Sequence, residues 1–210
     1  IAQFVASTST SLGISSGVFL SSGNASTASP NGPQGPNGAS GTTTGFGGPG
    51  DVNLNTVSTA GTEDAAILEF DFVPSNDSVK FRYCFGSEEY PEYAPPNNSG
   101  YNDVFAFFLT GPNPLGGNYT NKNIALIPGT TTAVSINNVN PVTNATFYRN
   151  NTGNLINCEF DGFTKVLFAL EKVVCGQTYH IKIAIADAGD DALDSGVFLE
   201  AGSFSSAPPL

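Results

Sequence analysis

The sequence is poor in charged residues, and above all in basic ones. Asp, Glu, Lys and Arg make up only 12% of its 210 residues, with seven Lys and Arg against 18 Asp and Glu. The formal net charge of -11 excludes a nucleic-acid backbone or an anionic membrane as a natural partner, because both would be repelled. So few cations also leave clustered carboxylates without compensation inside the chain, which favours a bound divalent cation.

Long apolar runs and the usual catalytic motifs are missing as well. No run of 18 or more apolar residues occurs, so no transmembrane helix and no membrane insertion are expected. A single histidine, His180, and the absence of Cys-x-x-Cys exclude a zinc site of ordinary type. The adjacent Glu88 and Glu89 point to opposite faces of an extended strand and cannot flank one scissile bond. We therefore expect no enzyme, and a hydrolase pairing distant acids such as Glu88 and Asp187 is the weakest alternative.

Cysteine is scarce, with only Cys84, Cys158 and Cys175. Three cysteines allow one disulfide and one free thiol. Cys158 and Cys175 flank an apolar run and its turn, so a Cys158–Cys175 bridge is a candidate. Cys84 lies within a strand pattern and is expected to be a small buried thiol.

Gly, Ser, Thr and Asn are abundant, together with 16 Phe and 7 Tyr, which is typical of an extracellular β protein. About ten short strands with Gly and Asn turns, and no clear helix, predict an all-β, antiparallel β-sandwich of jelly-roll or lectin-like type with long Gly/Asn/Ser-rich loops. We expect one domain over residues 1–204 and the start of a linker at 205–210.

Period-two alternation predicts where the strands lie. Residues 65–73 and 78–85 alternate on either side of a short turn and predict a β-hairpin. Residues 104–109 are apolar on both faces, as in a buried strand, and residues 179–187 alternate most clearly. The β-branched and aromatic content of residues 163–174 favours strand over helix. Further short strands are expected at 17–20, 123–128, 133–136 and 197–201, and residues 21–62 are expected to form a long loop.

Two acidic clusters lie at predicted strand ends. The first opens and closes the loop between residues 84 and 104, and the second, which also contains Asp191 and Asp194, follows the strand at 179–187. A solvated acidic turn is the alternative reading of the second cluster, because its spacing lacks the EF-hand pattern. Ca²⁺ takes six to eight oxygen ligands, which such loops supply if both clusters meet at one end of the sandwich. The predicted calcium ligands are Glu88, Glu89, Asn102, Asp103, Asp187 and Asp190.

Three tyrosines, Tyr90, Tyr93 and Tyr101, lie beside the first acidic cluster. They either pack the loop against the sheet or form a platform on which a saccharide stacks its apolar face. The second interpretation makes them the candidate ligand-binding residues, with a glycan or a surface protein as the partner.

Long blocks of the sequence resemble the choice-of-anchor L domain, a module of bacterial secreted and cell-surface proteins. The resemblance runs from Leu12 to Ser206. It implies export and a place at the cell surface, and it implies little about activity. The blocks that carry it are DAAILEFDFVP, FGSEEYPEY, YNDVFAFFLTGP, NIALIPGTTTAVSINNVNP, FDGFTKVLFA and TYHIKIAIADAGDDALDSGVFLEAGSFSS.

The chain departs from the family in two ways. Members usually carry further strands before the segment matching IAQFVAS, and often further cysteines before the FDGFT block. Because Ile1 is not a start methionine, a mature or processed fragment is expected. We expect an extracellular, calcium-stabilised surface domain acting in adhesion or glycan binding. The alternative is a filament subunit that self-associates by strand addition at an open sheet edge.

Overall fold

A computed structural model of the chain describes residues 1–6, 12–25, 41–97 and 101–206. The strands are β1 (Ala2–Val5), β2 (Ser16–Ser21), β3 (Thr62–Phe72), β4 (Ser78–Ser87), β5 (Val104–Pro112), β6 (Asn118–Asn123), β7 (Tyr148–Asn150), β8 (Gly162–Thr164), β9 (Leu167–Lys172), β10 (Tyr179–Ala188) and β11 (Ser195–Glu200), and two short 3-10 turns are η1 (Leu54–Thr56) and η2 (Ala145–Phe147). Residues 26–40 of the predicted loop and 207–210 of the predicted linker lie outside the described ranges.

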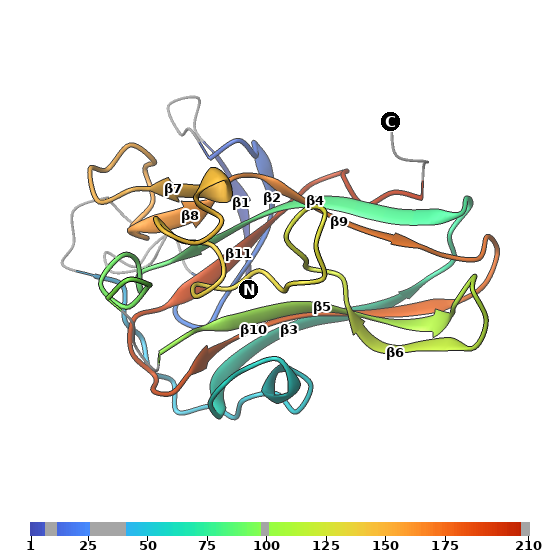
Figure 1. Cartoon of the computed structure of the whole chain (residues 1–210), viewed down its shortest axis with the longest axis horizontal. Helices are drawn as coiled ribbons and strands as arrows, with labels where there is room; N and C mark the ends of the chain where they lie inside the picture. The colour runs from blue at the N-terminus through green and yellow to red at the C-terminus, as the bar shows by residue number, and fades with distance from the viewer. Residues whose placement is uncertain (7–11, 26–40, 98–100, 207–210) are drawn as a thin grey trace.

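The strands form two antiparallel sheets that lie face to face (Figure 1). The larger sheet has the order β1-β2-β11-β4-β8-β7, with β9 also paired to β4, and the smaller has the order β3-β10-β5-β6. Several consecutive strands lie in different sheets, so the chain crosses repeatedly between the two layers. The predicted all-β sandwich is confirmed.

The main core fills the space between the sheets. Alternation along β10 turns Ile181, Ile183 and Ile185 inward, where they meet aromatic side chains of β4 and β5. Phe85 stacks on Phe105 there, with 4.8 Å between ring centroids. Because a strand alternates with period two, the residues that follow these inward positions at the strand ends also face the inter-sheet space.

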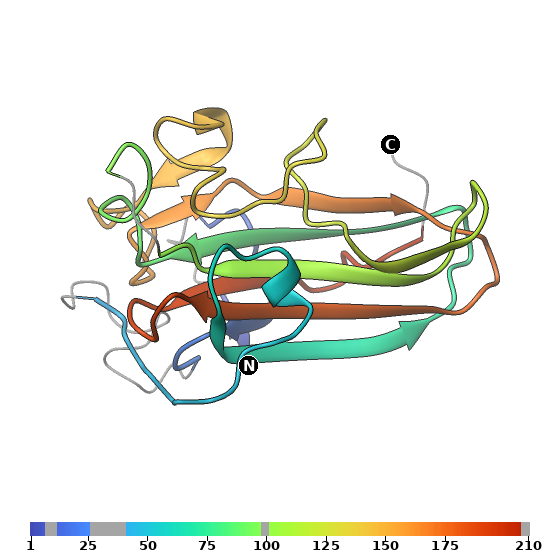
Figure 2. The ribbon, with the colours of Figure 1, turned by 60° about the horizontal axis from the view of Figure 1, so that its bottom comes forward.

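The outer face of the smaller sheet is covered as well, which explains why β5 is apolar on both faces. Leu54 of η1 packs with Phe108 and Ala184 on that face, across which the segment lies in Figure 2. Asp51 anchors the segment by accepting hydrogen bonds from the Leu54 amide (3.0 Å) and from Lys182 Nζ (2.5 Å). The Lys182 ammonium therefore already has its carboxylate.

A third apolar cluster lies on the outer face of the larger sheet. Cys84, Phe163 and Phe198 belong to it, and Phe19 stacks on Phe198 at 4.3 Å between ring centroids. Cys84 thus points away from the core that holds its neighbour Phe85. Odd-numbered residues of β4 face inward, and even-numbered residues face this outer layer.

The predicted hairpin between residues 65–73 and 78–85 is wrong. Both segments are strands, but β3 pairs with β10 while β4 pairs with β11 and β9, so the turn between them joins the two sheets. Phe70 and Phe81 both pack against the ring of Phe204, with centroid separations of 5.3 and 5.7 Å. Alternation indicates that each segment is a strand with one apolar face. It does not indicate whether two such strands pair within one sheet or pack face to face across the core.

Other strand predictions fare unevenly. Residues 163–174 form β8 and β9 and no helix, as their composition predicts. The two strands predicted at 123–128 and 133–136 are reduced to the single bridge Leu126↔Ala133. The strands β6, β7 and β1 were not predicted, because β6 and β7 are mostly polar and β1 has only four residues.

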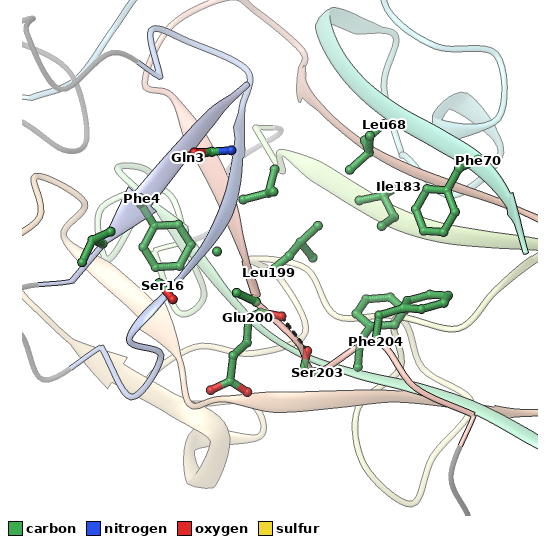
Figure 3. A pocket seen from close by; sticks show the side chains of 15 residues that line it. Gln3, Phe4, Ser16, Leu68, Phe70, Ile183, Leu199, Glu200, Ser203 and Phe204 are labelled. Carbon is green, nitrogen blue, oxygen red and sulfur yellow. Dashed lines mark hydrogen bonds between the residues drawn. The ribbon is translucent and has the colours of Figure 1, made fainter.

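An apolar groove of about 460 Å³ opens where the edges of the two sheets approach each other (Figure 3). Leu68, Phe70 and Ile183 of the smaller sheet line one side, and Leu199 and Phe204 line the other. Its walls include β1 and β3, which are the edge strands of the two sheets.

Candidate functional site

Strands β2, β4, β5, β10 and β11 begin or end together at one end of the sandwich, on the left in Figure 1. There the inward positions change from apolar to acidic. The ladder between β10 and β5 runs to the pair Ala186↔Val104, so its next step sets Asp187 opposite Asp103. Both carboxylates therefore close the same end of the inter-sheet core.

The larger sheet brings polar groups to the same place. Ser195, the first residue of β11, donates from its hydroxyl to Asp103 Oδ2 at 2.6 Å. The Ala188 amide donates to Asp103 Oδ1 at 3.1 Å. Glu89 follows β4, and its amide donates to the Ser87 hydroxyl at 2.9 Å. Asp103 is thus hydrogen-bonded at both oxygens and links the two sheets.

Asp187 is fully buried, and within the described part of the chain neither of its carboxylate oxygens has a donor in good hydrogen-bond geometry, although the nearby Ser22 hydroxyl lowers its pKa as a hydrogen-bond donor does. The neighbouring Ser22 hydroxyl donates to the Ser195 carbonyl (3.4 Å). Glu89 is 2% exposed, and its Oε2 also lacks a donor there. Buried polar groups are normally paired, so these oxygens call for a proton or a positive ion.

The electrostatics of the site are those of like charges held out of water. Burial raises the pKa of Asp187 to about 9, and the charge of Asp103 is the next cause. Burial raises the pKa of Glu89 to about 8, followed by the charges of Asp190 and Asp187. The pKa of Asp103 is also raised by burial, although its bond from Ser195 opposes the rise. These side chains, distant in sequence, therefore act on one another.

No basic side chain neutralises this end of the sandwich. All seven Lys and Arg residues lie in the described ranges, and the ion pairs seen there join Lys182 to Asp51, Arg82 to Glu200 and Lys122 to Glu171, besides those of His180. None of these pairs involves the inward-facing acids at the strand ends. The charge deficit foreseen from the composition is therefore concentrated at this site.

The remaining predicted ligands are placed less favourably. Asn102 is buried, but its Oδ1 accepts a hydrogen bond from the Asn137 amide (3.0 Å) and thereby holds the following loop. Asp190 is half-buried, and its Oδ1 accepts from the Ala192 amide (3.3 Å). Within the residues described, no three His, Cys, Asp or Glu side chains already stand in the arrangement of a metal-ion site.

The sequence model of the choice-of-anchor L domain matches residues 1–205 of the chain. The chain belongs to that family. Membership implies a secreted or cell-surface protein of bacterial type, and the family is not a known enzyme family. Neither the curated proteins nor the solved structures contain a match to this choice-of-anchor L domain. None of the helical segments in the described ranges is long and apolar enough to cross a membrane.

The structure corrects one of the tyrosine predictions for this choice-of-anchor L domain. Tyr90 is fully buried, packs against the tilted ring of Tyr148 and donates a hydrogen bond from its hydroxyl to the Val139 carbonyl at 2.5 Å. It packs the loop and cannot contact a ligand. Tyr93 and Tyr101 are each 37% exposed and lie edge to face, with 5.6 Å between their ring centroids.

The Cys158–Cys175 disulfide predicted from the sequence is not formed, and no two cysteines are bridged in the described part of the chain. Cys158 is buried in the apolar cluster outside the larger sheet, near β8. Cys175 is exposed in the turn after β9, where the Gly176 amide bonds the Pro74 carbonyl at the other end of the sandwich (Figure 1). Because Cys158 and Cys175 lie on either side of an extended apolar segment, they are separated by about the length of a strand and cannot form a bridge.

Several residues at this end were not among the predicted ligands. Asp194 is fully buried and accepts from the Thr44 amide (2.9 Å) and the Thr42 hydroxyl (2.8 Å). Glu159 and Asp161 approach Glu88 from the segment before β8. The one sequence signal that could have identified Glu159 and Asp161 as site residues is their position, two residues apart and directly before β8.

Proposed function

We propose that this choice-of-anchor L domain is a calcium-stabilised ligand-binding module of a bacterial surface protein. The observation that carries the proposal is Asp187, which is fully buried beside Asp103 and Glu89 and whose two oxygens accept no well-formed hydrogen bond in the described part of the chain. Calcium binds through oxygens, and carboxylates are its usual protein ligands. Asp187 and Glu89, with Asp190 and Asp103 beside them, are the residues that would hold the ion.

The free energy involved argues for an ion over protons. Holding Asp187, Glu88 and Glu89 protonated at pH 7 costs roughly 3–4 kcal/mol each, because each carboxyl would ionise near pH 4 in the unfolded chain. Even one such cost is a large part of the stability of a typical domain, which is roughly 5–15 kcal/mol. A divalent cation removes most of that penalty by favouring the charged forms.

The ligand-binding part of the proposal rests on the loop between β4 and β5. It begins with Glu89 and ends with Asp103, so an ion at the site holds both of its ends. The Tyr93 amide bonds the Glu89 carbonyl at 2.9 Å, which ties the exposed Tyr93–Tyr101 pair to the same end of the loop. Exposed aromatic rings beside hydroxyl-binding oxygens suit a saccharide, whose apolar face stacks on a ring.

Glycan binding should therefore depend on both the tyrosines and calcium. We expect a glycan array probed with the domain in calcium to give signals that Tyr93→Ala and Tyr101→Ala reduce at least about tenfold, since losing one stacked ring costs roughly 1.4 kcal/mol or more. A chelator should abolish the same signals. Phe168→Ala, which removes an exposed ring on β9, is the matched control. Equal binding by the variants and the control would contradict the saccharide assignment.

A second candidate, a filament subunit, is favoured by the apolar groove in Figure 3. The edge strands β1 and β3 border it, and a strand from a second copy of the chain would satisfy their backbone groups while burying its own apolar side chains. We expect Leu68→Lys to abolish concentration-dependent assembly in sedimentation velocity runs. A native protein that stays monomeric at high concentration would rule this candidate out.

A further inference from the structure

The outer edge of β9 is open, since in the described part of the chain β9 pairs with β4 and with no other strand. On the far side of β4, the amide and the carbonyl of Lys80 both bond Ser205, at 2.9 Å each. Lys80 faces Leu170 in the ladder, so the backbone groups of Leu170 point to the open side of β9. The Lys172 carbonyl points the same way and accepts from the Tyr119 hydroxyl at 3.2 Å. Within the described ranges the amide and carbonyl of Leu170 have no such partner.

The outer edge of β3 is open in the same way. The Phe107 carbonyl accepts from the Ile124 amide at 2.9 Å, on the side of β5 away from β10. Ile183, which faces Phe107 in β10, therefore turns its backbone groups to β3, where it faces Leu68. Glu69 follows Leu68, so its backbone groups point away from β10. They too are without a hydrogen bond in the part of the chain that the structure describes.

The β9 edge is basic and apolar. Lys80 lies on the outer face of the larger sheet, and the register places Leu170 beside it on the same face, followed two residues later by Lys172. Leu170 is 45% exposed. Lys172 is exposed and belongs to none of the ion pairs seen in the described ranges. On a molecule with a net charge of -11, this edge is suited to an acidic strand.

The β3 edge is acidic and apolar. Leu68 packs against the core, so the alternating positions Ile67, Glu69 and Asp71 lie on the outer face of the smaller sheet. Ile67 is 37% exposed, and the side chains of Glu69 and Asp71 are 53% and 69% exposed. His180 bonds one oxygen of Asp71 at 2.8 Å. The residues that point their backbone groups outward on β3 thus also carry its exposed carboxylates.

The two edges lie on opposite sides of the sandwich. β4 has β9 on one side and β11 on the other, and the larger sheet continues from β11 through β2 to β1. β1 borders the groove of Figure 3 together with β3, so β3 lies on the side away from β9. The two edges of one molecule therefore cannot meet each other. A contact between them joins two copies and leaves one edge of each copy free for the next.

We propose that the open edge of β9 binds the open edge of β3 in a second copy of this chain. The inference rests on the second candidate function, self-association, and names the two surfaces that meet. Backbone hydrogen bonds of Leu170 and Glu69 hold the strands together, as in other cases of strand addition. Lys80 and Lys172 against Glu69 and Asp71 select the partner edge, because two β3 edges or two β9 edges would place like charges opposite each other.

Charge reversal at the two edges tests the pairing. We expect the double variants Lys80→Glu/Lys172→Glu and Glu69→Lys/Asp71→Lys each to weaken self-association at least about tenfold in sedimentation velocity runs. An equimolar mixture of the two should associate again, because each supplies the edge that complements the other. The second variant makes the whole molecule less negative, so general charge repulsion cannot explain its weaker association.

Asp77→Lys is the control, because Asp77 is an exposed acid outside both open edges, in the turn between β3 and β4. It should leave self-association unchanged, and circular dichroism checks that every variant is folded. Wild-type association that neither double variant weakens would overturn the pairing and leave self-association through another surface standing. Variants that fail to associate on mixing would also overturn it. A wild type that stays monomeric at high concentration would remove the second candidate function as well, while leaving the calcium proposal intact.

Discussion

Calcium should raise the melting temperature of the domain by about 5–10 °C. This estimate takes free calcium at about one hundred times its dissociation constant, which stabilises the folded state by roughly 2.7 kcal/mol, and about 2–4 °C per kcal/mol for a chain of this size. The stabilisation arises because the ion binds the folded arrangement of Asp187, Asp103 and Glu89 and has no such site in the unfolded chain. Differential scanning calorimetry with calcium and with a chelator measures it.

The pH dependence of the metal-free protein provides a second measure of the buried acids at this end of the sandwich. The pKa of Asp187 is raised to about 9, and those of Glu88 and Glu89 to about 8, whereas all three ionise near pH 4 when unfolded. Between these values the folded state binds more protons at these three groups, so their contribution to stability is fully present below about pH 4 and is lost as pH rises toward 9. Calcium should flatten this fall. A metal-free stability that rises from pH 5 to pH 8 would contradict the burial of these acids.

The substitution Asp187→Asn should stabilise the metal-free domain, although most core substitutions destabilise. The amide removes a carboxyl that costs roughly 4 kcal/mol to keep protonated at pH 7, and its NH₂ group can donate to the facing carboxylates. We expect a gain of about 2 kcal/mol or more in the free energy of unfolding, from urea denaturation in chelator. Calcium should then add far less stability than it adds to the wild type.

Asp191→Asn is the matched control, because Asp191 lies in the same turn and is exposed. It should change the stability by less than about 0.5 kcal/mol and leave the response to calcium intact. If Asp187→Asn and Asp191→Asn behave alike, the buried carboxylate has no special role. If Asp187→Asn destabilises the metal-free protein, the contact of Asp187 with the Ser22 hydroxyl outweighs the cost of the buried carboxyl.

Much of this site was accessible from strand periodicity. The alternation of residues 179–187 fixes which of them face the core, and a sandwich gathers such strand ends at the same level, which is why Asp187 meets Asp103. The surroundings of Tyr90 were not accessible, because an aromatic residue in an acidic loop has the same local pattern whether it is exposed or buried. Glu159 required the pairing of β8 with β4, which the sequence does not specify.

The errors in strand pairing have one physical origin. Short turns favour pairing of consecutive strands, yet Phe70 and Phe81 belong to opposite layers because both pack around Phe204. That contact joins residues more than a hundred positions apart, and no local rule anticipates it. The prediction of a Cys158–Cys175 disulfide failed for a related reason. The two cysteines are close in sequence, but the extended strand between them holds them apart in space.

The acids at the end of the sandwich come from both layers, Glu89 from the larger sheet and Asp187 with Asp103 from the smaller. An ion shared among them would resist a force that pulls one sheet away from the other. The hydrophobic core alone opposes such a force only weakly once the two sheets begin to separate. Mechanical unfolding in calcium should then require a higher rupture force than in chelator. A surface protein exposed to fluid flow would then owe part of its mechanical stability to calcium ions in the surrounding medium.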